Sequence, residues 1–307
     1  MTPVTNKISA GQSPVLSLNN GVKLPALGLG VFQSAPDVTA SAVVTAVQHG
    51  YRLIDTAAAY FNEREVGEGI KRSGIDRGEL FITTKLWMSD YGYERALRAF
   101  DISMRKLDLD YLDLYLLHWP VPTAFDATVD AYRAAERLLA DGRVRAIGVC
   151  NFTAAHLKTL VDRSEIVPAV NQVELHPFFI QRELREAHRS LGIITQSWSP
   201  LGGVNVYHSA EPTAAKNPLQ NEVVATIAAK HAKTPAQIVL RWHIEHGLSA
   251  IPKSIRPERI AENIALFDFK LTDEDVRSID GLDSGVRGGP NPEVVDPKLF
   301  NLSIPDA

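Results

Sequence analysis

The amino-acid sequence predicts an α/β fold in which eight strand–helix units close into a (β/α)8 barrel. Short apolar runs alternate with helical patterns along the chain, and 307 residues suit eight such units with modest insertions. Several of the runs are apolar on both faces, which is typical of strands covered on both sides. Alternating strands and helices pair in parallel through right-handed crossovers. No linker rich in Pro, Gly or Ser interrupts the pattern, so we expect residues 1–307 to form a single domain.

The predicted strands are short runs dense in Val, Ile, Leu and Tyr, bounded by polar or glycine-containing segments. They span residues 27–31, 51–55, 80–85, 111–118, 144–149, 169–175, 192–198 and 248–253.

The predicted helices show apolar residues at spacings of three and four, with recognisable start and stop signals. Thr153 caps one expected helix, and Thr234 followed by Pro235 opens another over 234–247. Glycines end the helices predicted over 37–50 and 128–144. Further helices are predicted over 37–50, 93–109 and 128–144.

Three segments fall outside the alternation. Residues 1–25 form an N-terminal arm with a hairpin signal at Asn20-Gly21. Residues 283–307 are rich in Gly and Pro and predict an irregular tail over the barrel mouth. The long loop 201–216 is a candidate lid.

Composition excludes several classes of protein. The net charge of −4 argues against nucleic-acid binding through general phosphate attraction. A single cysteine excludes a disulfide framework and a Cys-based metal centre. No apolar run approaches the roughly 20 residues that span a bilayer, and the N-terminus lacks the apolar core of a signal peptide. We therefore expect a soluble, cytoplasmic protein with no membrane or nucleic-acid partner.

A metal site is not expected either. His243 and His246 are three residues apart, but no H-E-x-x-H motif accompanies them. A solvent-facing helix explains these two histidines better.

Ionisable residues end three consecutive predicted strands: Asp55, Lys85 and His118. The carboxyl ends of barrel strands carry the chemistry in this fold class, and neighbouring strands lie about 4.8 Å apart. Tyr60, on the loop that leaves the second strand, can reach the same point. The four side chains therefore predict a proton-transfer unit.

Their chemistry follows from charge. A tyrosine with its ordinary pKa of about 10 is a poor acid at neutral pH. The ammonium of Lys85 favours the phenolate and lowers the pKa of Tyr60, while Asp55 holds the lysine charged and oriented. His118 can donate a hydrogen bond to a substrate oxygen, or pass a proton through Tyr60.

Two familiar motifs are absent. No G-x-S-x-G elbow supports a serine hydrolase. Gly28-Leu-Gly30 and Gly67-Glu-Gly69 lack the third glycine of a Rossmann fingerprint. Phosphates would instead meet the end of the eighth strand, where Lys253 and Ser254 precede a helix start and Arg259 follows in its first turns. A solvated basic loop is the alternative interpretation of this stretch.

These residues resemble the aldo-keto reductase family. Residues 55–63 resemble its D-T-A-x-x-Y-x-N-E signature, and Lys85 in ITTKLW and His118 in LDLYLLHWP match its other two catalytic positions. GVCNF, NQVELHP, SWSPLG and IPKS occur in the family's order, and the likeness covers about residues 16–285. The bacterial 2,5-diketo-gluconate reductase branch looks closest.

The resemblance implies a TIM barrel with an N-terminal hairpin, two extra helices and an irregular C-terminal tail. It also implies a cytoplasmic, monomeric oxidoreductase that acts on CH–OH groups and uses NADPH/NADP+ to reduce a small carbonyl substrate. Tyr60 would be the general acid, Lys85 would depress its pKa, Asp55 would support Lys85, and His118 would orient the carbonyl.

The cofactor site is implied in the same way. Asn151 and Gln172 would hold the nicotinamide carboxamide, Trp198 would stack on the ring, and loop 201–216 would fold over the pyrophosphate. Lys253 and Arg259 suit a 2′-phosphate, which predicts NADPH over NADH. The full set of implied cofactor contacts is Cys150, Asn151, Gln172, Trp198, Ser199, Leu201, Lys253, Ser254, Arg259, Glu262 and Asn263.

Two departures from the family pattern stand in this set. Trp198 replaces a common tyrosine and should stack at least as well. Cys150 replaces a serine, and a thiol is a weak donor, so either the carboxamide anchor is weaker or Asn151 and Gln172 suffice for it. A passive small residue is the favoured interpretation of Cys150, and an oxidation site is the alternative.

Phe32, Trp87 and Trp119 follow the first, third and fourth strands and predict an aromatic-walled substrate pocket beside His118. Two alternatives to a reductase stay open. One is an NADPH-binding regulatory or structural barrel with little turnover. The other is a hydrolase or isomerase with a Schiff base on Lys85, against which Asp55 argues by keeping that lysine protonated.

Overall fold

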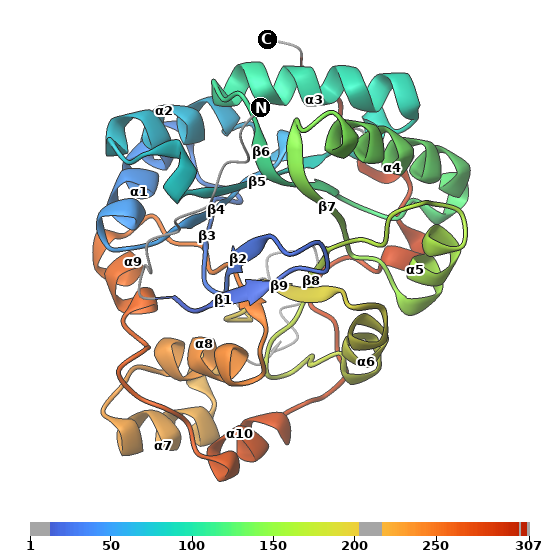
Figure 1. Cartoon of the computed structure of the whole chain (residues 1–307). Helices are drawn as coiled ribbons and strands as arrows, with labels where there is room; N and C mark the ends of the chain where they lie inside the picture. Colours follow the sequence, from blue (N-terminus) through green and yellow to red (C-terminus); the bar gives the residue numbers. More distant parts are fainter. Residues whose placement is uncertain (1–12, 203–216, 301, 306–307) are drawn as a thin grey trace.

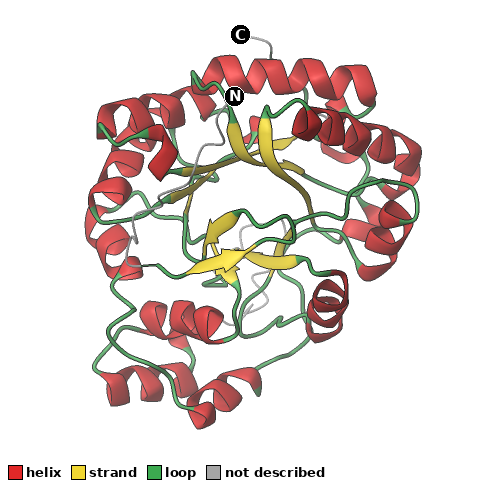
Figure 2. Ribbon diagram, in the orientation of Figure 1, coloured by secondary structure: helices red, strands yellow, loops and turns green. Residues whose placement is uncertain are grey.

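The computed structural model describes residues 13–202, 217–300 and 302–305. Eight strands form one parallel sheet in the order β10-β9-β8-β7-β6-β5-β4-β3. Parallel bridges from Leu27 to Ala250 and from Gly30 to Lys253 join the first strand to the last. The predicted (β/α)8 barrel is confirmed (Figures 1 and 2). The barrel strands are β3 (Leu29–Gly30), β4 (Leu53–Asp55), β5 (Phe81–Leu86), β6 (Leu112–Leu117), β7 (Val144–Cys150), β8 (Val170–Glu174), β9 (Ile194–Trp198) and β10 (Ser249–Ala250).

The first and last barrel strands are shorter than the sequence predicts. The runs 27–31 and 248–253 contain regular strands of only two residues each. Pro252 has no N–H for a ladder, and its carbonyl instead accepts from the Gly30 N–H at 3.1 Å. The barrel therefore closes at this seam through single bridges.

Helices surround the sheet, as the ring of ribbons in Figure 1 shows. Thr153 and Thr234 cap α5 and α8 as predicted, each accepting from the backbone N–H three residues on. Eight helices follow the barrel strands: α1 (Pro36–Gln48), α2 (Glu63–Ser73), α3 (Tyr93–Leu107), α4 (Phe125–Ala140), α5 (Ala154–Val161), α6 (Arg182–Leu191), α8 (Pro235–Glu245) and α9 (Pro257–Ile264).

Two further helices, α7 (Glu222–His231) and α10 (Asp273–Asp280), are the expected extra ones. The helix predicted over 128–144 begins earlier, at Phe125. It ends earlier as well, at Ala140, because the chain turns at Gly142, where φ is +71°. Single 3-10 turns lie at η1 (Ala58–Tyr60), η2 (Arg77–Glu79), η3 (Met88–Asp90), η4 (Pro122–Ala124) and η5 (Pro218–Gln220).

The N-terminal hairpin predicted at Asn20-Gly21 is present. Strands β1 (Val15–Ser17) and β2 (Lys23–Pro25) pair antiparallel. Leu24 of the hairpin belongs to the same buried cluster as Leu53 and Phe81, which begin β4 and β5. The hairpin thus lies at the amino ends of the strands, opposite the predicted site (Figure 1).

The C-terminal tail is less irregular than the sequence predicts. It holds a 3-10 turn, η6 (Pro292–Val294), and a one-turn helix, α11 (Pro297–Phe300). The indole of Trp87 donates to the carbonyl of Leu302 at 3.1 Å, which ties the tail to the end of β5.

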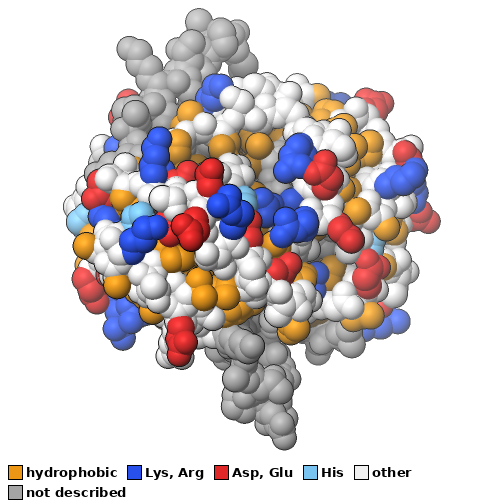
Figure 3. Space-filling model, turned by 90° about the horizontal axis from the view of Figure 1, so that it is seen from below, with side chains coloured by type: hydrophobic (Ala, Val, Ile, Leu, Met, Phe, Trp, Pro, Cys, Tyr) orange, Lys and Arg blue, Asp and Glu red, His pale blue; other side chains and the backbone are white. Residues whose placement is uncertain are grey.

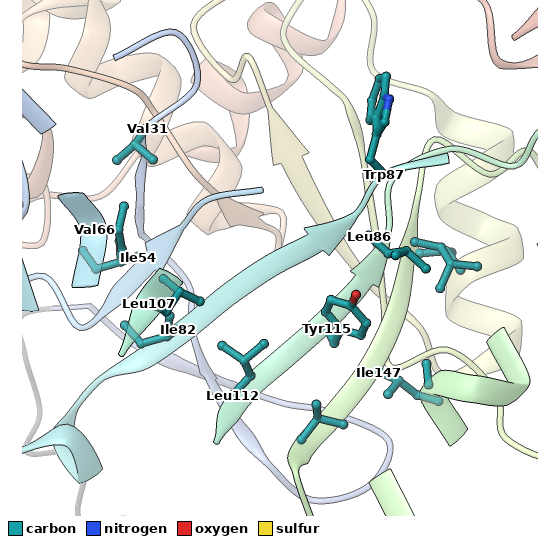
Figure 4. Close-up of a cluster of buried hydrophobic side chains, with 14 of the residues drawn as sticks. Val31, Ile54, Val66, Ile82, Leu86, Trp87, Leu107, Leu112, Tyr115 and Ile147 are labelled. Atoms are coloured by element: carbon teal, nitrogen blue, oxygen red, sulfur yellow. The ribbon is translucent and has the colours of Figure 1, made fainter. Parts of the chain in front are cut away.

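Apolar side chains fill the space between the sheet and the helices. Figure 4 shows Ile54, Ile82, Leu112 and Ile147 pointing from successive strands toward the helical layer, and all four are buried. Burying an aliphatic side chain of this size stabilises the fold by about 1.5–3 kcal/mol. This packing fixes the strands whose carboxyl ends carry the site.

His243 corrects one expectation. The sequence predicts that His243 and His246 lie on a solvent-facing helix, but His243 is fully buried. Its ring nitrogens lie 2.8 Å from the Val239 carbonyl and 3.1 Å from Ser197 Oγ. This face of α8 packs on the barrel, so the histidine is a hydrogen-bonded core residue.

The surface seen in Figure 3 mixes Lys and Arg with Asp and Glu, and neither sign dominates that face. Among the helices of the described ranges, none is long and apolar enough to cross a membrane.

Candidate active site

The carboxyl ends of β4, β5 and β6 bring the predicted ionisable residues together. Asp55 ends β4, Lys85 lies near the end of β5, and His118 follows β6 directly. Tyr60 ends the 3-10 turn η1 that leaves β4. In the parallel register Asp55 pairs with Thr83, two residues before Lys85, and Lys85 pairs with Leu116, two residues before His118.

Lys85 is the centre of this group and is fully buried. Its ammonium donates to Asp55 Oδ1 at 2.5 Å, to the Thr56 carbonyl at 2.8 Å and to the phenol oxygen of Tyr60 at 3.2 Å. All three protons of the ammonium are therefore used. The phenol oxygen accepts from Lys85, which leaves the phenol's own proton free for a partner in the cavity.

Burial and charge compete in setting the ionisation of this group. Burial is the largest single effect and lowers the pKa of Lys85, but the neighbouring groups, Asp55 first among them, together outweigh it and the net pKa is raised, so the lysine stays cationic. Burial raises the pKa of Asp55, and the Lys85 ammonium opposes that shift. The pair is a desolvated ion pair held by short, charge-assisted hydrogen bonds.

Tyr60 differs from the prediction. The Lys85 charge lowers its pKa as expected, but burial acts more strongly and raises the pKa of Tyr60 to about 12. Desolvation disfavours a buried phenolate, and the neighbouring Asp55 charge disfavours it further. Lys85 therefore lowers the pKa of Tyr60, as expected, but burial outweighs it, and Tyr60 is a neutral phenol at physiological pH.

His118 lies beside Tyr60, with 5.7 Å between their ring centroids. Burial and the Lys85 charge lower the pKa of His118 well below its usual value, so its imidazole is neutral at pH 7. Within the described ranges, its buried Nδ1 has no hydrogen-bond partner. A neutral ring can still donate one hydrogen bond, which favours the expected role toward a substrate oxygen over that of a proton source.

A cavity of about 930 Å³ opens above these residues. All three predicted aromatic residues line it, and the Phe32 ring lies 5.0 Å from that of Tyr60. Figure 4 shows Trp87 just beyond the end of β5, where it belongs to the buried cluster and also lines the cavity. The C-terminal tail also lines the cavity, as predicted, but the sequence did not indicate which of its residues do so: Gly289, Pro290, Phe300 and Leu302.

The predicted cofactor contacts divide into two sets. Those that line the cavity are Asn151, Gln172, Trp198, Ser199, Leu201, Lys253 and Arg259. Those outside its lining are Cys150, Ser254, Glu262 and Asn263. Cys150 is buried and its pKa is raised by that burial, so it is a neutral thiol. The proposed lid lies mostly in 203–216, outside the described residues.

A hydrogen-bond network joins the amides to the ionisable group. Gln172 Nε2 donates to Asp55 Oδ2 and to Gln196 Oε1, both at 2.8 Å. Asn151 donates to the His118 carbonyl at 3.0 Å and accepts from the Trp198 indole at 2.8 Å. The contribution of Gln196 was not predicted, because an inward-facing strand residue has no signature in a single sequence.

The far part of the cavity is cationic. Lys253 and Arg259 line it, and both are exposed. Two predicted neighbours are engaged elsewhere: Ser254 Oγ accepts from the Arg256 N–H at 3.1 Å, and Glu262 accepts from Thr234 at 2.8 Å. The two cations are thus available to an anionic group.

Left-handed backbone conformations gather at this end of the barrel. Gln33, Asn151 and Ser199 have φ of +54°, +64° and +49°, and all three line the cavity. Non-glycine residues in this region cost about 1–3 kcal/mol and persist where the surroundings hold them, often at functional sites. Among the described residues, no group of three or more His, Cys, Asp or Glu could hold a metal ion.

The fold and this arrangement define a class: a (β/α)8 barrel with its ionisable residues buried at the carboxyl mouth and a long cavity beside them. The profile of the Aldo/keto reductase family matches residues 26–284, and the chain belongs to this family. The resemblance inferred from the motifs is thereby confirmed.

Individual relatives are similar over almost their whole length. A morphine 6-dehydrogenase of Pseudomonas putida is 55% identical, covering 95% of this chain and 98% of the relative. A glyoxal reductase of Bacillus subtilis is 49% identical over 91% of this chain and 96% of its own length. The crystal structure of an aspartate-to-alanine mutant of Gox0644 in complex with NADPH is 43% identical, with a TM-score of 0.84 over 92% of this chain and 99% of that chain.

Proposed function

We propose that this protein is an NADPH-dependent carbonyl reductase that converts aldehydes or ketones of the carbonyl, dicarbonyl or keto-acid type to alcohols. The observation that carries the proposal is the contact of 3.2 Å between the Lys85 ammonium and the Tyr60 phenol at the base of the cavity. The names of the relatives support it, since one is a glyoxal reductase and another a morphine 6-dehydrogenase.

The residues of the cavity fit NADPH. The floor offers amides at Asn151 and Gln172 and the indole of Trp198, and the far part offers the two cations Lys253 and Arg259. A planar amide-bearing ring at one end and phosphates at the other match this distribution of groups. A related structure was solved with NADPH. When bound, NADPH supplies a hydride to the carbonyl carbon.

Tyr60 delivers the proton. Its phenol lies on the cavity floor with its oxygen accepting from Lys85, so its proton points to the space where a carbonyl oxygen would lie. An alkoxide is a stronger base than a phenolate, so a phenol with a pKa of about 12 still protonates it. Lys85 then stabilises the phenolate, and Asp55 keeps that lysine charged.

His118 and the aromatic walls orient the substrate. A neutral imidazole can donate one hydrogen bond to the carbonyl oxygen without competing for its proton. Phe32, Trp87 and Trp119 exclude water around it. We further propose that the whole chain works as one domain, as a monomer in the cytoplasm, on CH–OH groups and their carbonyl counterparts.

The test measures NADPH oxidation against a panel of aldehydes, diketones and keto acids, together with quenching of protein fluorescence by NADPH. Turnover with at least one class, alongside saturable quenching, supports the reductase. Tight NADPH binding with no oxidation across the panel would instead favour a binding barrel with little turnover.

A further inference from the structure

Glu174, the last residue of β8, is buried at the barrel mouth with 1% of its surface exposed. Its Oε1 accepts from the Gly288 N–H at 2.7 Å and its Oε2 from the Gly289 N–H at 2.9 Å. His176 also lies 3.1 Å from Oε1. A buried carboxylate thus uses both oxygens to hold two successive peptide groups of the C-terminal tail.

The held segment lies directly on Trp198. A Cβ added to Gly289 would lie 2.5 Å from the far edge of the Trp198 indole and 3.2 Å from Glu174 Oε2. No real Cβ fits at 2.5 Å from another heavy atom, so this position accepts only glycine while the indole stays in place. The reason is space, because the backbone of Gly289 is outside the left-handed region.

Trp198 is held from its other side as well. Its Nε1 donates to Asn151 Oδ1 at 2.8 Å, and Asn151 in turn donates to the carbonyl of His118. The indole is therefore fixed between the tail at one edge and the strand-end residues at the other. Any shift of the Gly288–Gly289 peptides removes one of these two supports.

We propose that Glu174 is a positioning residue: it fixes the Gly288–Gly289 segment against Trp198 and thereby sets where that indole lies in the cavity. The consequence for cofactor affinity rests on the proposed function, since there Trp198 contacts the nicotinamide. The hold of Glu174 on the tail does not depend on that function. Bidentate acceptance by a buried carboxylate is a strong anchor, because hydrogen bonds to a charged group are about twice as strong as neutral ones.

Two variants test separately the Glu174 carboxylate, which holds the tail, and Gly289, which contacts Trp198. Glu174→Gln keeps the shape but turns one acceptor into an NH2 donor that faces a backbone N–H. Gly289→Ala leaves the carboxylate in place and puts a methyl group where the indole lies. Thr123→Val is the matched control, because Thr123 binds Asp296 further along the tail at 2.9 Å and lies outside the cavity lining.

The first measurement uses the full chain without cofactor. Amide hydrogen exchange in a peptide that contains residues 288 and 289 should rise at least tenfold in Glu174→Gln and stay unchanged in Thr123→Val. Unchanged exchange in folded Glu174→Gln would overturn the proposal. If that variant does not fold, Glu174→Asp, which keeps the charge but shortens the side chain by one methylene, gives the same test, and unchanged exchange in the folded Glu174→Asp variant would overturn the proposal equally.

The second measurement is NADPH affinity in a double-mutant cycle. Gly289→Ala should weaken NADPH binding about tenfold in the native background but less than twofold when Trp198 is already alanine. Equal losses in both backgrounds would show that Gly289 acts without Trp198 and would overturn the coupling. Should the unaltered protein bind no NADPH, the proposed function fails, and the exchange measurement still decides the role of Glu174.

Discussion

At the level of single residues, the charge of Lys85 organises the site. A buried ammonium is costly unless it is paired and fully hydrogen-bonded, and here Asp55, Thr56 and Tyr60 take all three of its protons. The raised pKa of Lys85 keeps that charge fixed. Its cation argues against a Schiff-base role, since a protonated amine is not nucleophilic.

The raised pKa of Tyr60 predicts a simple pH dependence. Reduction needs the protonated phenol, and a group whose pKa is about 12 keeps its proton as the pH rises through neutrality. His118 is neutral above its lowered pKa and adds no inflection near its usual value. We therefore expect kcat/KM for reduction to be flat between roughly pH 6 and 9. A loss of activity centred near neutral pH would show that the phenol ionises earlier.

Arg259 is expected to contribute to cofactor choice. It lines the cationic part of the cavity, so Arg259→Ala should weaken NADPH binding about tenfold, the lower range for a hydrogen bond to a charged group. NADH, which lacks the 2′-phosphate, should lose much less. Titrations of both cofactors measure this difference, with Arg256→Ala as the control because Arg256 is outside the cavity lining. Equal losses for NADPH and NADH would contradict the assignment.

At the level of elements, the close packing of α2 against α3 outweighs the general preference of helices for alanine over glycine. Gly67 lies within α2, where alanine normally favours a helix by about 1 kcal/mol. A Cβ there would lie 2.2 Å from the Leu107 carbonyl oxygen at the end of α3. Backbone cannot move aside as a side-chain tip can, so the overlap outweighs the propensity gain.

We therefore expect Gly67→Ala to lower the free energy of unfolding by about 1–2 kcal/mol. Urea denaturation measures this loss. Gly78→Ala is the control, since a Cβ at Gly78 meets nothing within 4 Å. Stabilisation by Gly67→Ala would show that α2 and α3 are less closely packed than described.

Much of the fold and the base of the site follow from the sequence, because they depend on local signals. The apolar runs, the caps at Thr153 and Thr234 and the strand-end residues Asp55 and Lys85 are all read from short windows. The anchoring of Gly288 by Glu174 joins residues 114 apart and has no local signature. The raised pKa of Tyr60 could not be predicted from the sequence either, because the depth of burial is a property of the folded barrel.

At the scale of the whole molecule, the site depends on closure of the barrel. The cavity is lined by residues from Gly30 on β3 to Lys253 after β10, and these two meet across the seam. A ligand that spans the cavity therefore contacts both the first barrel strand and the segment that follows the last one. Binding to this site requires the folded barrel and so stabilises it.

NADPH at a hundred times its Kd should raise the free energy of unfolding by about 2.7 kcal/mol. Thermal melts with and without NADPH measure the effect, and Arg259→Ala should reduce the gain at the same NADPH concentration. No shift of Tm at saturating NADPH would mean that the cofactor does not bind the native state.

The central claim is that the Tyr60 phenol protonates the substrate. The most direct test is the single-turnover rate of NADPH oxidation in Tyr60→Phe, with NADPH affinity measured in the same protein. We expect the rate to fall by a factor of about 10²–10⁴ with affinity nearly unchanged, because only the hydroxyl is lost. A rate equal to that of the unaltered protein would contradict it.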